Sequence, residues 1–219
     1  PLTQRVWVTF GTGRFLSEDD SKDTATQSLY GLYDDGSAVG SRTALVARSF
    51  TVHDASLRLR GIEAHGALPQ DKRGWVIDLG VPSPQNDGER VVATPLVRGR
   101  AAVIASIIPA SGNRCAPGGR GYLNAVDVFT GTALPGSGGS SSYFDLNGNG
   151  RSDDDVLSGT DGQKHAVGSV DVGVGMPTNP NQVENLLVVG GSTGERGSVP
   201  TQPGSGGPRR VLWRERYER

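Results

Sequence analysis

Hydrophobic and polar residues alternate along much of the chain in short runs, which glycine, proline or aspartate interrupts. Arg5–Phe10 (RVWVTF) and Gly74–Leu79 (GWVIDL) illustrate the pattern. A period of two with branched and aromatic residues is typical of β-strands. No window has a convincing 3.6-residue helical period. The pattern therefore predicts an all-β protein.

The runs predict short strands joined by turns. Arg90–Val97 and Arg100–Ile108 are expected to form a hairpin around Arg98-Gly99. The other predicted strands are Arg5–Phe10, Gln27–Tyr33, Ala44–Val52, Ser56–Leu59, Gly74–Leu79, Tyr122–Val128, His165–Val174, Asn185–Val189 and Val211–Tyr217. Many short strands with glycine turns are typical of a barrel, a sandwich or a propeller.

Polar segments separate these strands. SEDDSKD (Ser17–Asp23) is interpreted as a loop, with Asp19-Asp20 in a solvated turn. PGSGGSSS, after the Thr130-Gly131 turn, is interpreted as a glycine-serine linker, and Pro200–Pro208 as a flexible segment.

A weak internal repeat favours one of the three architectures. Tyr30–Asp34, Trp75–Asp78 and Tyr122–Asp127 each begin with an aromatic residue and end at an aspartate before a glycine turn. Their spacing is close to the period of a four-stranded propeller blade, about 40–50 residues. Aspartate before a turn is also ordinary turn chemistry. The spacing favours a β-propeller of four-stranded antiparallel blades over a sandwich.

Composition excludes several classes of partner. The 22 basic and 23 acidic side chains nearly cancel, and no segment is strongly basic, so nucleic acid is not an expected partner. No apolar run approaches the ~20 residues of a membrane helix. The chain starts at Pro1 directly before a predicted strand, which suggests a mature or excised fragment of a longer protein.

The single Cys115 has no partner for an internal disulfide. It is a buried small hydrophobe, a free thiol, or a cysteine whose partner lies elsewhere in a longer chain. His53, His65 and His165 are far apart and form no zinc-ligand motif. Neither the cysteine nor the histidines therefore predict catalysis.

The strongest candidate for chemistry is the twelve-residue stretch Asp145–Val156, DLNGNGRSDDDV. Oxygen-bearing side chains fall at loop positions 1, 3, 5 and 9 of a calcium loop, and Gly150 falls at position 6, where the chain turns sharply. The carbonyl at position 7 supplies a further oxygen. The predicted calcium ligands are Asp145, Asn147, Asn149, Arg151 through its carbonyl, and Asp153.

The loop departs from an EF-hand in two respects. Val156 stands at position 12, where an EF-hand has a bidentate glutamate, and no amphipathic helix flanks the loop. We therefore predict a loop-only, EF-hand-like calcium site between two strands, in which Asp154, Asp155 or water fills the missing position. A solvated Asn/Gly/Asp turn is the alternative.

Beyond these patterns, several segments resemble the PilY1/PilC family of type IV pilus proteins. The segments occur in the same order as in that family and span nearly the whole chain. They are Val8–Leu16, Thr26–Asp34, Arg73–Leu79, Gly88–Val97, Ile107–Gly131, the calcium loop and Arg209–Glu218. The resemblance identifies residues 1–219 as a C-terminal β-propeller domain of that family, or as its later blades.

The resemblance implies a role at the bacterial surface. The members of that family suggest a protein that is exported through the periplasm to the outer membrane and pilus tip. There it would act as an adhesin, and its calcium loop would regulate pilus extension, retraction and twitching. The implied partners are minor pilins and a host or abiotic surface receptor. The family's N-terminal half is absent here, and Asn149 stands where the family often has an acid, which should weaken calcium binding.

Two other functional classes remain open at this point. NAVDVFTG (Asn124–Gly131) also resembles the blade motif of quinoprotein dehydrogenases. Those enzymes need near-identical repeats that end in tryptophan, whereas the three tryptophans here are unevenly spaced. A calcium-dependent lectin, in which the ion contacts a sugar, is the other alternative. We expect a protein without enzymatic activity.

Overall fold

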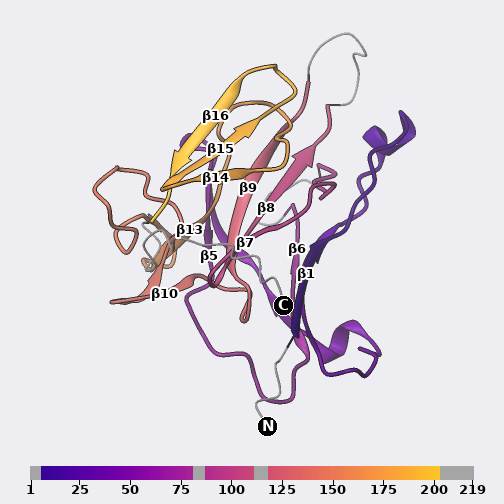
Figure 1. Cartoon of the computed structure of the whole chain (residues 1–219), viewed down its shortest axis with the longest axis vertical. Helices are drawn as coiled ribbons and strands as arrows, with labels where there is room; N and C mark the ends of the chain where they lie inside the picture. Colours follow the sequence, from indigo (N-terminus) through magenta and orange to yellow (C-terminus); the bar gives the residue numbers. More distant parts are fainter. Residues whose placement is uncertain (1–5, 81–86, 111–117, 203–219) are drawn as a thin grey trace, which may run out of the picture.

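The computed structural model describes residues 6–80, 87–110 and 118–202, and it confirms the all-β prediction (Figure 1). Two short 3₁₀ helices, η1 (Asp19–Lys22) and η2 (Arg42–Ala44), accompany the strands. The strands are β1 (Val6–Gly11), β2 (Ser28–Asp34), β3 (Val46–Arg48), β4 (Phe50–Asp54), β5 (Leu59–Ile62), β6 (Gly74–Asp78), β7 (Leu96–Arg98), β8 (Ala101–Ile108), β9 (Arg120–Asp127), β10 (Leu134–Gly136), β11 (Gly139–Ser141), β12 (Val156–Ser158), β13 (Lys164–Val170), β14 (Asn181–Val183), β15 (Leu186–Gly190) and β16 (Arg196–Pro200).

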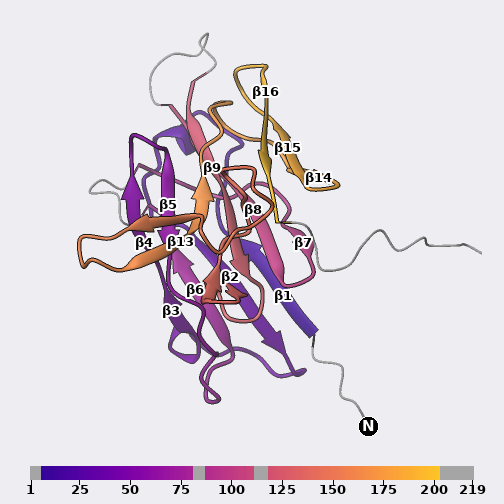
Figure 2. The same ribbon diagram turned by 90° about the vertical axis from the view of Figure 1, so that its left-hand side faces the viewer.

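These strands form four sheets. The largest has seven strands, in the order β4-β5-β13-β9-β8-β7 with β12 paired to β13. A second sheet has the order β1-β2-β6-β3, a third β14-β15-β16, and β10 and β11 form a separate hairpin. In Figure 2 the β14-β15-β16 sheet lies at the upper end of the molecule and the β1-β2-β6-β3 sheet at the lower end.

The β8–β9 hairpin forms the centre of the molecule. All eight residues of β8 are buried, so this strand has no solvent face. Its alternate side chains pack into two different hydrophobic cores. Val103 and Ala105 belong to the first core, and Ala102 and Ile104 belong to the second. A strand buried on both faces reads as a continuous apolar run, as AAVIASII does. One hairpin thus links both cores.

Trp75 of β6 is the largest side chain of the second core. It is fully buried and its indole N–H donates to the carbonyl of Val128, 2.9 Å away. Gly31 and Gly131 lie directly against its ring, where a Cβ on either would overlap it. The aromatic residue that begins the second copy of the predicted repeat is therefore a packing anchor between β2 and the turn after β9.

Most predicted strands are present, with altered bounds. Ala44–Val52 is two strands, because β3 pairs with β6 in one sheet and β4 pairs with β5 in another. Of the predicted Arg90–Val97 strand, only the end forms β7, which pairs with β8 around Gly99 as expected. The predicted glycine-serine linker is instead the β10–β11 hairpin, and β12, β14 and β16 were not predicted.

The prediction of a strand over Ser56–Leu59 is wrong. Ala55 to Arg58 form a turn in which the Asp54 carboxylate accepts the N–H groups of Ser56 and Leu57, both at 2.9 Å. Arg58 adopts a positive φ of 57°, which a strand does not allow. Strand β5 therefore begins at Leu59.

Within the described residues the sheets do not close into a ring. The seven-stranded sheet exceeds a four-stranded blade, and the four-stranded sheet contains the parallel pair β3–β6. Only the all-β part of the predicted propeller architecture is therefore visible in these sheets. Cys115 and the predicted strand Val211–Tyr217 lie outside the described residues.

Candidate metal site in the Asp145–Val156 loop

The loop connects β11 to β12, so it joins two strands as predicted. Both of its ends are fixed to the core. The fully buried Phe144 precedes the loop and forms a β-bridge with Thr201, and the Asp145 N–H donates to the carbonyl of Pro200 at 2.9 Å. At the other end Val156 pairs with Ala166 of β13.

The first half of the loop curls around the Asp145 side chain. This carboxylate is 5% exposed, and its two oxygens accept the N–H groups of Asn149 (3.1 Å) and Gly150 (2.8 Å). Gly150 has a φ of 78°, the left-handed conformation that its predicted turning role requires. The Asn147 side-chain oxygen accepts the Asn149 N–H at 3.0 Å, and the Asn149 oxygen accepts the Arg151 N–H at 2.8 Å.

Asp153, the predicted position-9 ligand, contacts Arg151 of the same loop and Ser137 of the β10–β11 hairpin. Its carboxylate forms an ion pair with the Arg151 guanidinium at 3.1 Å and accepts the Ser137 hydroxyl at 3.0 Å. The Arg151 and Ser137 hydrogen bonds hold the pKa of Asp153 below its usual value. Asp153 thus ties the loop to the turn of the β10–β11 hairpin.

Asp154 and Asp155 lie at the end of the loop and differ in their surroundings. One Asp154 oxygen accepts the Asn149 side-chain amide at 2.7 Å and the Asn147 amide at 3.4 Å. Asp155 is 6% exposed, and burial, reinforced by the nearby charges of Asp154 and Asp145, raises its pKa to about 6. The backbone N–H groups of Leu146, which donates to Asp155 at 3.0 Å, and of Asn147 oppose that rise only in part.

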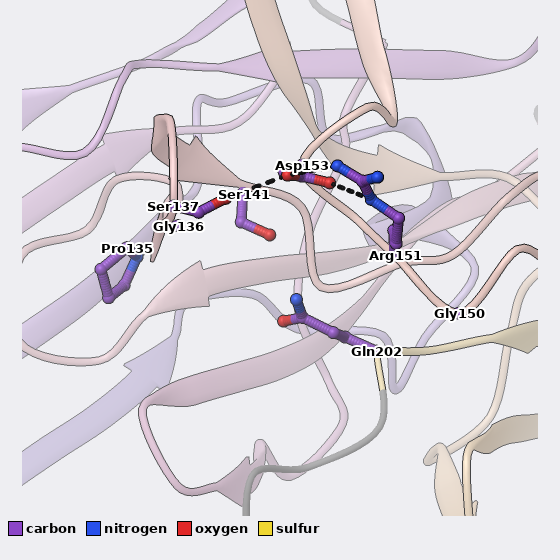
Figure 3. A pocket seen from close by; sticks show the side chains of 8 residues that line it. All are labelled: Pro135, Gly136, Ser137, Ser141, Gly150, Arg151, Asp153 and Gln202. Atoms are coloured by element: carbon purple, nitrogen blue, oxygen red, sulfur yellow. Dashed lines mark hydrogen bonds and ion pairs between the residues drawn. The ribbon is translucent and has the colours of Figure 1, made fainter.

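A polar hollow of about 540 Å³ opens beside the loop (Figure 3). In the close-up, the Arg151 and Asp153 side chains project from the loop on one side, and Ser137 and Ser141 lie opposite on the β10–β11 hairpin. Gln202 lies below them. Pro135, Gly136 and Gly150 complete the lining. The sequence pattern did not indicate these neighbours, because Ser137 was interpreted as part of a linker and Gln202 is distant from the loop in sequence.

The donor set of the loop fits a hard cation. Calcium is held by six to eight oxygens from carboxylates, amides and carbonyls, and the loop offers these types within one continuous segment. One oxygen of the buried Asp155 carboxylate has no hydrogen-bond partner, which is the environment that a cation would satisfy. No cluster of three or more His, Cys, Asp or Glu side chains suited to a metal occurs among the described residues. Amide and carbonyl oxygens would therefore have to supply part of the coordination.

Comparison with known proteins gives close sequence relatives. No protein-family model matches the chain. Over 97% of its length the chain is 32% identical to a type IV pilus biogenesis factor PilY1 homolog of Xylella fastidiosa. A second PilY1 homolog of that organism is 33% identical over 59% of the chain. The chain spans 17% and 9% of the lengths of these two relatives.

The fold also has a solved counterpart. The crystal structure of the Pseudomonas aeruginosa PilY1 C-terminal domain matches 90% of the chain with a TM-score of 0.66 at 21% identity. The match covers 42% of that solved chain, so the described sheets correspond to part of it. No helix among the described residues has the length and apolar character needed to cross a membrane.

Proposed function

The chain belongs to the PilY1 family, as part of its C-terminal domain, and we propose that it serves type IV pilus biogenesis as a calcium-binding module without catalytic activity. The names of its relatives support the pilus role. The longer protein would act at the cell surface, after export through the periplasm to the outer membrane and pilus tip. Its partners would be minor pilins and a host or abiotic surface receptor.

The observation that carries calcium binding is the Asp145–Val156 loop. Asp145, Asn147, Asn149, the Arg151 carbonyl and Asp153 are the proposed ligands from the spacing rule, with a further oxygen from the end of the loop. Few of these ligands are charged, and Val156 replaces the usual glutamate. Because affinity follows ligand charge, we expect a dissociation constant of about 10⁻⁴–10⁻³ M, typical of extracellular modules.

Calcium would act on the pilus by ordering the loop. Asp145, Asp154 and Asp155 bring like charges close together, and two positive charges among them would relieve the repulsion. The exposed middle of the loop, which borders the hollow, would then present a fixed surface to pilus components. The ion shifts this equilibrium only by its differential affinity for the ordered state.

Titration calorimetry of the purified chain tests calcium binding, and a dissociation constant in the nanomolar range or no binding at millimolar calcium contradicts the estimate. The pilus role requires cells that carry Asp145→Ala in the full-length protein. We expect reduced surface piliation and twitching, with Asp161→Asn, in the turn after β12, as a matched control. Normal twitching in cells whose protein has lost calcium binding would rule out calcium regulation of the pilus.

We further propose that the open sheets are blades of a propeller that the longer protein completes. The support is that the relatives are several times longer than this chain, and that the match covers less than half of the solved domain. A structure of the whole C-terminal region tests this proposal directly. Sheets that do not pack face to face around a common central channel there would contradict it.

The hollow beside the loop favours one second candidate, a calcium-dependent lectin. Its lining is polar, with hydroxyl, amide and charged groups that suit sugar hydroxyls. Glycan-array binding that requires calcium and is lost in Arg151→Ala would support this candidate, and binding to no glycan would exclude it.

A further inference from the structure

Strand β16 has one edge on β15 and a second edge that faces away from it. The Thr201 N–H donates to the Asn185 carbonyl of the turn before β15, at 2.8 Å, and the ladder between the two strands continues from there. Backbone groups of successive residues point to opposite edges of a strand. Arg196, Ser198 and Pro200 therefore direct their backbone groups to the second edge.

This second edge is paired only at its C-terminal end. Residues 143–145 run beside it there, and the Asp145 N–H donates to the Pro200 carbonyl at 2.9 Å. No strand among the described residues reaches Arg196 or Ser198 on this edge, and both residues are exposed. Native proteins usually pair, cover or charge such an edge. The edge at Arg196 and Ser198 is thus able to accept another strand.

The hydrophobic core beneath the edge is incompletely covered. A Cβ at Gly197 would lie 2.8 Å from Val174 and 2.9 Å from Val172, so both valines lie against the inner face of β16. Val174 is buried, whereas Val172 is only partly buried against the first core. A strand added to this edge would extend the inner face of the sheet beside Val172.

The chain beyond Gln202 contains a segment with the pattern of such a strand. In residues 211–217 (VLWRERY), Val211, Trp213 and Tyr217 fall on one face, and Arg214 and Arg216 fall on the other. An antiparallel strand with one face on a core and one in water has this alternation. The apolar pattern also determines which face turns inward, because a shift by one residue would bury the arginines.

The connection from Gln202 is long enough to return to this edge. Gln202 and Ser198 are four residues apart along an extended chain, or about 13 Å at ~3.3 Å per residue. The intervening residues 203–210 can span up to about 26 Å, which leaves room to pass residues 143–145. Their sequence, PGSGGPRR, is rich in the residues that form turns. Strands that follow one another in sequence also lie side by side in most sheets.

We propose that residues 211–217 of this chain form a fourth, antiparallel strand on the open edge of β16, with Val211 and Trp213 on its inner face. This inference goes beyond the proposed function, because the pairing requires no calcium. The C-terminal segment then converts the β14-β15-β16 sheet into a four-stranded sheet. Arg214 and Arg216 remain in water on its outer face, as Arg196 does.

Amide hydrogen exchange of the full chain, followed by NMR in calcium-free buffer, tests the pairing. The N–H groups of Arg196 and Ser198 point away from β15, so they are protected only if another strand accepts them. We expect both to exchange at least about 100-fold more slowly than in an unstructured peptide, at every protein concentration. Exchange at the unstructured rate would overturn the proposal.

Two neighbouring substitutions of equal chemistry test the inward face. Val211→Lys places a charge on the inner face, so we expect faster exchange at Arg196 and Ser198 and a melting temperature lower by at least about 3 °C. Leu212→Lys, on the outer face, is the matched control and should change neither. The Gly197 amide, which is directed to β15, should stay protected in both variants, because the loss is confined to the added strand.

The remaining outcomes distinguish other occupants of the edge. Protection of Arg196 and Ser198 that increases with protein concentration would assign the edge to a second copy of the chain and overturn the proposal. Slow exchange in residues 211–217 with fast exchange at Arg196 and Ser198 would place the segment on another edge, such as that of β1. Equal effects of Val211→Lys and Leu212→Lys would show that the assigned face is wrong. None of these results depends on whether the chain binds calcium.

Discussion

At the scale of single residues, the most constrained group is a buried ion pair between Arg60 and Glu89. Two guanidinium nitrogens contact the two Glu89 oxygens at 2.8 Å, and both side chains are almost fully buried. Burial alone would raise the pKa of Glu89, but the Arg60 charge and the Ser106 hydrogen bond hold it below its usual value. Arg60 also lies 3.7 Å from the centre of the Tyr122 ring.

Replacing Glu89 with alanine should therefore destabilise the chain strongly. The variant leaves the Arg60 charge buried without its partner, and breaking such a pair costs about 3–5 kcal/mol. Urea denaturation measures the loss. Glu195→Ala, on an exposed turn, serves as the control and should change stability by less than about 0.5 kcal/mol. A loss below about 1 kcal/mol at Glu89 would mean that water reaches Arg60.

Asp20 is the acid for which the sequence prediction was wrong. It was expected in a solvated turn, but it is 3% exposed. Its oxygens accept the N–H groups of Leu16 and Ser17, both at 2.8 Å, and the Arg14 guanidinium at 2.6 Å. The Leu16 hydrogen bond is the largest cause that holds the pKa of Asp20 far below its usual 3.8, and Arg14 adds to it against the opposing effect of burial.

This pKa shift predicts the pH dependence of stability. A lowered pKa in the folded state means that the ionised Asp20 contributes stability above pH 3.8, and the contribution is lost progressively as pH falls below that value. Asp20→Asn should lower the melting temperature at pH 7, and its difference from wild type should shrink below pH 4. Melts from pH 2 to pH 7 measure this, with Asp19→Asn as the control. A difference independent of pH would show that charge plays no part.

At the scale of elements, close packing between β2 and β6 has a sharp test. A Cβ at Gly31 would lie 2.2 Å from Cε2 of Trp75, so Gly31→Ala forces the buried indole or the strand to move. Overpacking of this kind typically costs about 1–3 kcal/mol. Gly40→Ala has open space around its Cβ and is the matched control. Equal stability of the two variants would show that β2 can shift freely.

Strand β1 is an open edge among the described strands, because it pairs with β2 alone. Its outward residues Val6, Val8 and Phe10 are 53%, 46% and 36% exposed. Long apolar edges of this kind promote association between chains, and a lysine on them blocks it. Val8→Lys should therefore reduce self-association of the isolated chain in sedimentation experiments, without a change in melting temperature. Leu57→Lys, in the β4–β5 turn, should have no such effect.

Local patterns were sufficient to predict those elements whose environment is uniform. GWVIDL became β6 because its residues are buried by neighbours on both sides of the strand. Ala44–Val52 failed as one strand because the chain leaves one sheet and enters another near Ser49, whose hydroxyl contacts Glu63. Periodicity in a single run carries no information about which sheet each half joins.

In the candidate site, too, one half of the loop follows from local spacing and the other half depends on distant strands. The spacing of Asp145, Asn147 and Asn149 is local, so the sequence was sufficient to predict the turn at Gly150. Their role as calcium ligands stays a prediction. The burial of Asp155 and the contact of Asp153 with Ser137 depend on distant strands. Local spacing could therefore not predict the different surroundings of the three consecutive acids, Asp153, Asp154 and Asp155.

At the scale of the whole molecule, the two cores should unfold together. The β8–β9 hairpin contributes to both, so neither core can lose its packing while the other keeps its own. Thermal melts followed by far-UV circular dichroism and by tryptophan fluorescence should coincide. The chain should also melt cooperatively without calcium, because the exposed middle of the loop belongs to neither core. Two separate transitions would contradict this prediction.

The loop is fastened at its buried ends and exposed between them, and this arrangement has an evolutionary consequence. The fold constrains Phe144 and Val156, because they pair with Thr201 and with Ala166 of β13. The exposed stretch from Leu146 to Arg151 is free of that constraint. Substitutions in the middle of the loop can therefore accumulate while the surrounding strands keep their structure. Relatives that keep the same strands would then differ in the oxygen ligands that their loops offer, and so in the cation that they bind.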